Sequence, residues 1–111
     1  MTAFEVTQLE RAWWQRQAAA ELAAILDAHA DVPVIAWTVS AFGGSLSGRV
    51  TAPASQARGL FTAWQQALRL DDIAETPAGN GMAGYLRARA WRDGVLVTVI
   101  ATAPGREGED R

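Results

Sequence analysis

The sequence ARGLFTAWQQALRL, residues 57–70, decides how the rest of this chain can fold. Its large apolar residues recur at helical spacing and share one side of an α-helix: Leu60, Phe61, Trp64 and Leu68. Ser55 stands where a helix N-cap is expected. The segments before and after this stretch both have the alternation of β-hairpins, so we expect them to pack on this helix. Trp64, at the centre of the stripe, is predicted to be the most buried tryptophan.

The first segment, Thr2–Ala30, is rich in helix formers, contains no internal glycine or proline, and must end before Pro33. It carries two apolar stripes on nearly opposite sides of the helix. One consists of Val6, Leu9, Trp13, Ala20 and Ala24, and the other of Trp14, Ala18, Leu22 and Ile25. A single core can bury only one stripe, so the other is expected to self-associate. We place this self-association surface on Trp14 and Leu22.

Two hairpins are predicted from alternating apolar and polar residues on either side of short turns. In the first, strands Val34–Phe42 and Ser45–Ala52 flank Gly43-Gly44. Counting outward from a two-residue loop pairs Val39 with Gly48 and Trp37 with Val50 on the apolar face.

In the second hairpin, strands Met82–Trp91 and Val95–Ala103 flank Asp93-Gly94, the strongest turn signal in the chain. The same counting gives one face of small apolar pairs: Ala90 with Val97, Ala88 with Val99, and Leu86 with Ala101. The opposite face pairs Trp91 with Leu96, Arg89 with Thr98, Arg87 with Ile100, and Tyr85 with Thr102.

Together these elements predict an α+β fold of the order αββαββ, in which a four-stranded antiparallel sheet carries two helices on one face. Residues 1–103 are expected to form one domain, with 71–81 as a loop and 104–111 as a disordered tail without apolar residues.

Composition narrows the functional classes. The net charge of −2 argues against a strongly basic nucleic-acid or membrane binder, and the absence of cysteine fits a cytoplasmic protein. The longest apolar run, Val95–Ala103, is too short to span a membrane. His29 is the only histidine, and Asp71, Asp72 and Glu75 have the character of a solvated turn. No catalytic residue, metal site or cofactor is therefore predicted, and an enzyme is not expected.

The outer face of the second hairpin is the candidate binding surface. It brings together the aromatic residues Tyr85 and Trp91 with guanidinium groups and aliphatic side chains, namely Arg87, Arg89, Leu96, Ile100 and, from the first hairpin, Arg49. Aromatic and arginine side chains are enriched at the centres of protein interfaces. The same set could stack single-stranded bases and contact phosphates. A third interpretation is a face covered by the first helix or by a second subunit.

Three stretches give the chain a resemblance to a group of proteins: LAAILDAHADVPVIAWTV (22–39), LSGRV (46–50) and FTAWQQAL (61–68). In these residues it resembles short uncharacterised proteins of actinobacteria and of their phages or integrative elements. The resemblance implies a bacterial or phage origin and a cytoplasmic setting. It implies no particular activity. Our functional hypothesis is a non-enzymatic protein-interaction module, dimeric, with nucleic-acid binding through the second hairpin as the alternative.

Overall fold

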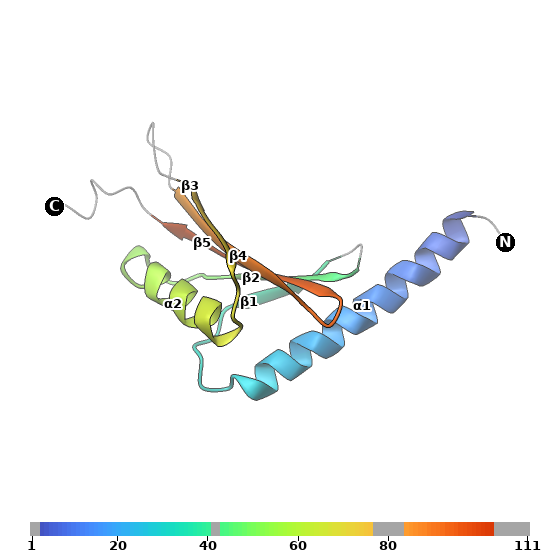
Figure 1. Cartoon of the computed structure of the whole chain (residues 1–111), viewed down its shortest axis with the longest axis horizontal. Helices are drawn as coiled ribbons and strands as arrows, with labels where there is room; N and C mark the ends of the chain where they lie inside the picture. The colour runs from blue at the N-terminus through green and yellow to red at the C-terminus, as the bar shows by residue number, and fades with distance from the viewer. Residues whose placement is uncertain (1–2, 41–42, 77–83, 104–111) are drawn as a thin grey trace.

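A computed structural model describes residues 3–40, 43–76 and 84–103 of the chain (Figure 1). In chain order its elements are α1 (Ala3–Ala28), β1 (Ala36–Val39), β2 (Ser45–Arg49), α2 (Ala54–Ala67), β3 (Asp72–Thr76), β4 (Gly84–Arg92) and β5 (Val95–Ala103). The strands form one sheet in the order β1-β2-β5-β4-β3. The predicted tail, 104–111, lies outside the described residues.

The α+β class is confirmed, but the predicted four-stranded antiparallel sheet is wrong in two respects. Asp72–Thr76, expected to be loop, pairs antiparallel with β4 as a fifth strand. It contains one large apolar residue, Ile73, which is 54% exposed, so the segment lacks the apolar alternation by which a strand is predicted. In addition, the two hairpins join through β2 and β5, which run parallel and make the sheet mixed.

The register predicted for the second hairpin is confirmed. Asp93 and Gly94 both have positive φ, as a two-residue hairpin turn requires. Every pair follows by counting outward from them, including Ala90 with Val97 and Arg87 with Ile100. The small apolar side chains of β4 and β5 therefore lie on the core face, and Tyr85, Arg87, Arg89 and Trp91 lie on the opposite face.

The register predicted for the first hairpin is wrong by two residues. Trp37 pairs with Gly48 and Val39 with Leu46, because the Ser40 amide donates to the carbonyl of Ser45 and the pairing closes there and not at Gly43-Gly44. A shift of two keeps each side chain on its predicted face, since side chains alternate with period two. Gly43 lies against α1: a Cβ there would stand 2.5 Å from the Cβ of Trp14. The helix therefore constrains this loop.

The central helix begins and ends differently from the prediction. Pro53, not Ser55, occupies the N-cap position, and no side chain caps this end. At the other end, Arg69 takes a left-handed conformation with φ of 56°. The Leu70 amide donates to the Gln65 carbonyl, which closes the helix in a Schellman motif. This reversal buries Leu70 and starts β3 immediately afterwards.

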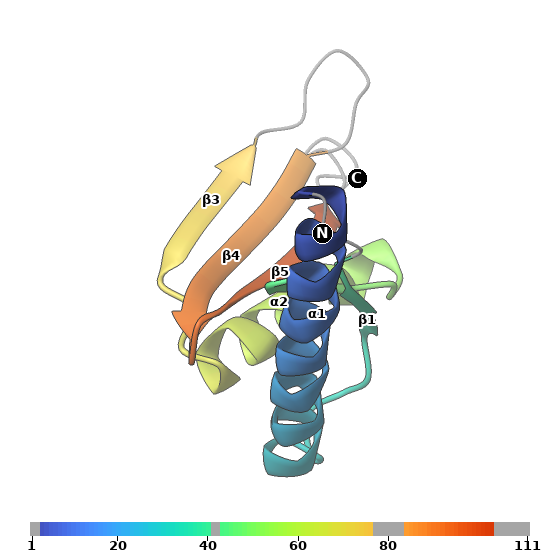
Figure 2. The same ribbon diagram turned by 90° about the vertical axis from the view of Figure 1, so that its right-hand side faces the viewer.

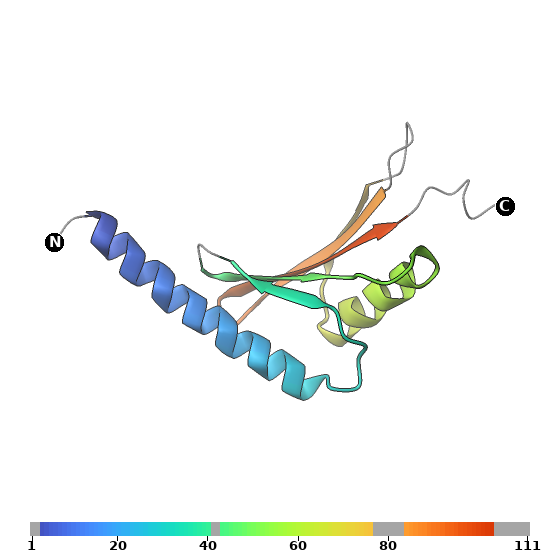
Figure 3. The same ribbon diagram turned by 180° about the vertical axis from the view of Figure 1, so that it is seen from behind.

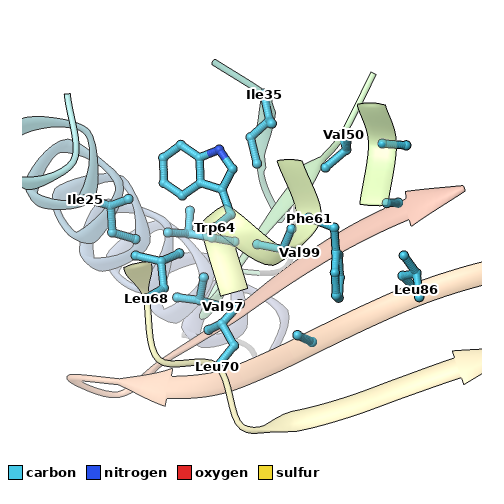
Figure 4. Close-up of a cluster of buried hydrophobic side chains, with 14 of the residues drawn as sticks. Ile25, Ile35, Val50, Phe61, Trp64, Leu68, Leu70, Leu86, Val97 and Val99 are labelled. Atoms are coloured by element: carbon cyan, nitrogen blue, oxygen red, sulfur yellow. The ribbon is translucent and has the colours of Figure 1, made fainter. Parts of the chain in front are cut away.

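The hydrophobic core lies between the sheet and both helices, which pack on the same face (Figures 1, 3 and 4). Trp64 is only 1% exposed and is the most buried tryptophan, as predicted. Its indole Nε1 donates to the Pro33 carbonyl at 2.7 Å, and its ring meets His29 and Trp37 edge-on. Trp64 thus joins α2 to the connection between α1 and β1.

The two apolar stripes of α1 are real, and the two residues predicted for self-association differ: Leu22 packs against the core, whereas Trp14 is 40% exposed. Ala18 and Ile25 are fully buried, and Leu22, on the same side, packs against the core. Trp14 is half-buried against the β1–β2 loop. The stripe that faces outward is the other one, on which Leu9, Trp13, Ala20 and Ala24 are exposed. Spacing alone could not decide between two equally apolar sides.

Replacing Trp64 by alanine is expected to cost about 3–5 kcal/mol of unfolding free energy, because it opens a large cavity and removes the hydrogen bond to Pro33. The matched control is Trp91→Ala, which removes the same side chain from a site 70% exposed and should cost less than about 1 kcal/mol. Urea denaturation followed by tryptophan fluorescence measures both. Equal stability of the two variants would contradict the central role of Trp64.

Candidate binding surface

Neither of the two described helices covers the opposite face of the sheet, which is called the open face below. Both helices lie below the sheet in Figures 1 and 3, and the first half of α1 extends past its end. In Figure 2 β3 and β4 lie to one side of α1, so this helix does not cross them. The expectation that the first helix covers the outer face is therefore wrong. Trp91, on this face, is 70% exposed and Tyr85 is 50% exposed.

Strand pairing arranges the side chains of the open face in rows across the sheet. One row contains Ala36, Arg49, Ile100, Arg87 and Ala74, and the next contains Thr38, Ser47, Thr98, Arg89 and Asp72. Tyr85 and Thr76 lie beside the first row, and Trp91 and Leu96 lie beyond the second. All seven residues predicted for the binding surface therefore share this face.

Arg89 of the predicted binding surface forms an ion pair with a carboxylate. Arg89 donates from Nε to Asp72 Oδ2 at 2.6 Å, an ion pair between β4 and the edge strand β3. This hydrogen bond and the positive charge of Arg89 lower the pKa of the Asp72 carboxyl below its ordinary value, and Arg87 adds a smaller effect of the same sign. Arg89 is thus neutralised by a residue that the sequence analysis had placed in a loop.

Arg87 and Arg49 have no such partner. Ion pairs among the described residues engage Arg58, Arg89 and Arg92, and neither Arg49 nor Arg87 has a carboxylate partner there. Within the same residues, the Nε atom of Arg87 is buried and makes no hydrogen bond. Within the described part of the chain, these two guanidinium groups are therefore the arginines of the open face without an ion pair.

Two hollows mark the open face at opposite ends of β4. The first has a volume of about 310 Å³ and is lined by Arg49, Ala74, Thr76, Tyr85, Arg87 and Ile100. The second has a volume of about 510 Å³ and is lined by Asp71, Asp72, Arg89, Ala90, Trp91 and Leu96. The first hollow is lined by two arginines, and the second is lined by Asp71 and Asp72 together with Arg89. The charge of the face therefore changes from positive to negative along β4.

The described residues contain no group of three histidine or acidic side chains close enough to hold a metal ion. His29 lies in the turn after α1, against the ring of Trp64, while Glu75 pairs with Arg58 at 3.0 Å. None of the helices formed by these residues has the length and apolarity needed to cross a membrane. The side chains of the open face are chiefly aromatic, aliphatic and guanidinium groups.

Comparison of the chain with protein-family models, with curated proteins and with solved structures finds no match.

The ion pair between Asp72 and Arg89 predicts a specific titration. The contribution of this pair to stability should be fully present above the ordinary pKa of aspartate and should be lost as pH falls through the lowered pKa of Asp72. Carbon-detected NMR of the carboxyl group should show Asp72 titrating below ordinary aspartates, and Arg89→Gln should raise its pKa toward the ordinary value. Arg58→Gln, which removes the partner of Glu75 instead, serves as the control. An Asp72 pKa unchanged by Arg89→Gln would contradict the pairing.

Proposed function

We propose that this protein is a non-enzymatic protein-interaction module whose working surface is the open face of the sheet. In this proposal it serves as a small accessory or regulatory protein in the cytoplasm of a bacterium, encoded by the host or by its phage. The supporting observation is that two large aromatic side chains, Tyr85 and Trp91, stand half or more exposed on a sheet face without a helix over it.

The composition of this face supports a protein partner. Tyrosine, tryptophan and arginine are the residues most enriched among those that dominate binding energy at protein interfaces. Here they alternate along β4, with Leu96 and Ile100 on the neighbouring strand. Exposing this much aromatic surface opposes solubility unless a partner covers it.

The alternative function is binding of single-stranded nucleic acid, with bases stacked on Tyr85 and Trp91 and phosphates near the arginines. Exposure of both aromatic rings favours it. The charge distribution opposes it, because Arg89 is neutralised by Asp72 and Asp71 lies at the Trp91 end. A polyanion running along β4 would meet these carboxylates, whereas a protein segment can place an acidic group at one end only.

We further propose that the protein acts as a homodimer through the outward stripe of α1. The bulky residues Leu9 and Trp13 occupy the first half of this stripe, and the small residues Ala20 and Ala24 occupy the second half. An antiparallel pairing of two copies places Trp13 over Ala20 and Leu9 over Ala24. The stripe is thus complementary to itself, as a two-fold interface requires.

Ala20→Glu is expected to shift the protein toward monomer, because it puts a charge under Trp13 of the second copy. Ala19→Glu makes the same change at an exposed alanine that lies off the stripe and should leave the association unchanged. Sedimentation velocity at tens of micromolar measures both. A parent chain that sediments as a monomer at this concentration would refute the dimer.

The function itself is tested by panning a display library of random twelve-residue peptides on the full-length protein. Selected peptides should bind about tenfold or more weakly to the Tyr85→Ala, Trp91→Ala double variant. Leu26→Ala, which removes an exposed apolar side chain from α1 off the outward stripe, should bind them like the parent. If instead a labelled 20-nucleotide RNA binds more tightly than any peptide, with a steep salt dependence, the nucleic-acid alternative is correct.

A further inference from the structure

The first hollow of the open face is built around one row of three residues on three adjacent strands. Arg49 on β2 is aligned with Ile100 on β5, and Ile100 is aligned with Arg87 on β4. Neighbouring strands lie about 4.8 Å apart, so the Cα atoms of the two arginines stand about 10 Å apart across the isoleucine. Two guanidinium groups on long side chains can therefore reach one anion from both sides.

The two arginines of this row differ from the arginines that form ion pairs among the described residues. Arg58, Arg89 and Arg92 each hold a carboxylate within 3.1 Å. Arg87 has a buried Nε–H group without an acceptor among the described residues, although it is only two residues from the paired Arg89. A buried donor without an acceptor costs free energy, and an anion in the hollow would recover it once the Arg87 side chain turns to present this group.

The walls of the hollow define the size and chemistry of the group that fits. Tyr85 and Thr76 contribute hydroxyl-bearing side chains to its lining, and Ala74 and Ile100 contribute apolar ones. A volume of about 310 Å³ is large enough for one carboxylate side chain and small compared with most cofactor sites. Arginine forks match carboxylate geometry with two parallel hydrogen bonds.

We infer that the hollow between Arg49 and Arg87 binds the carboxylate of an aspartate or glutamate in an acidic protein segment. This inference rests on the proposed function and specifies the partner's chemistry. A carboxylate is favoured over the phosphates of a nucleic acid because the opposite end of β4 is acidic, with Asp71 and Asp72 beside Trp91. A single anionic group is attracted to the Arg49 and Arg87 end of this face, whereas a continuous row of anionic groups would be repelled at the other end.

The position of Trp91 adds a second requirement on the partner. Trp91 is four residues from Arg87 on the same face, which corresponds to about 13 Å along an extended strand. Leu96 pairs with Trp91, and both line the second hollow. A segment lying along β4 would therefore place an apolar side chain about four residues from its acidic anchor.

The test uses two display libraries of twelve-residue peptides, panned on the full-length chain. One library encodes all residue types, and the other replaces aspartate and glutamate codons with those for asparagine and glutamine. We expect the complete library to yield binders that carry an acidic residue, and the acid-free library to yield binders at least tenfold weaker. The double variant Arg49→Gln, Arg87→Gln should lose at least tenfold in affinity for the selected peptides.

The matched control is Arg58→Gln, which removes the same kind of side chain from α2, outside the open face, where Glu75 already neutralises it. It should retain affinity within about twofold. Circular dichroism and a thermal melt check each variant, and the single variant Arg49→Gln, at an exposed position, keeps the test valid if the double variant does not fold. Arg49→Lys should restore part of the affinity, because it keeps the charge and loses the fork.

The remaining outcomes separate this inference from the proposed function. Acid-free binders of equal affinity that still require Tyr85 and Trp91 would overturn the carboxylate anchor and leave the interaction module standing. Acidic binders that ignore Arg49 and Arg87 would do the same. If neither library yields a peptide that depends on the open face, both proposals fail. A 20-nucleotide RNA bound through Arg49 and Arg87 in place of peptides would replace them with the nucleic-acid alternative.

Discussion

The hydrogen bond from the Trp64 indole to the Pro33 carbonyl is the contact on which the rest of the arrangement depends. It joins the middle of α2 to the connection between α1 and β1, at the point where α1 has just ended. The rings of His29 and Trp37 close around the same indole. Because this connection is short and held at Trp64, α1 must return to the sheet on the side that α2 already covers.

A second link reinforces this arrangement from the other end of the sheet. Arg92, the last residue of β4, donates to Glu21 of α1 at 3.1 Å and to the carbonyl of Leu68 after α2. One side chain thus ties both helices to the second hairpin. With both helices held on one face, Tyr85 and Trp91 are left on a face that no described helix covers.

The functional character of that open face is set by a contact between neighbouring strands. Asp72 on β3 neutralises its partner Arg89, whereas the β3 residue opposite Arg87 is the uncharged Ala74. Of the two arginines of β4 on this face, Arg89 is therefore neutralised and Arg87 keeps its positive charge. This difference makes a protein segment with a single acidic anchor a better match than a polyanion, although both would meet the same aromatic residues.

The sequence by itself determined the elements whose geometry is local. The Asp93-Gly94 turn fixes the register of the second hairpin, and with it the face of all four β4 residues of the candidate surface, since side chains alternate strictly from a known turn. The stripe of α2 likewise identified Trp64 as a core residue. Only the tertiary structure decided the rest. The parallel pairing of β2 with β5 and the addition of β3 depend on contacts between distant segments, and so does the ion pair that distinguishes Arg89 from Arg87. The outward stripe of α1 was equally undetermined, because two stripes of similar apolarity become unequal only when a sheet packs against one of them.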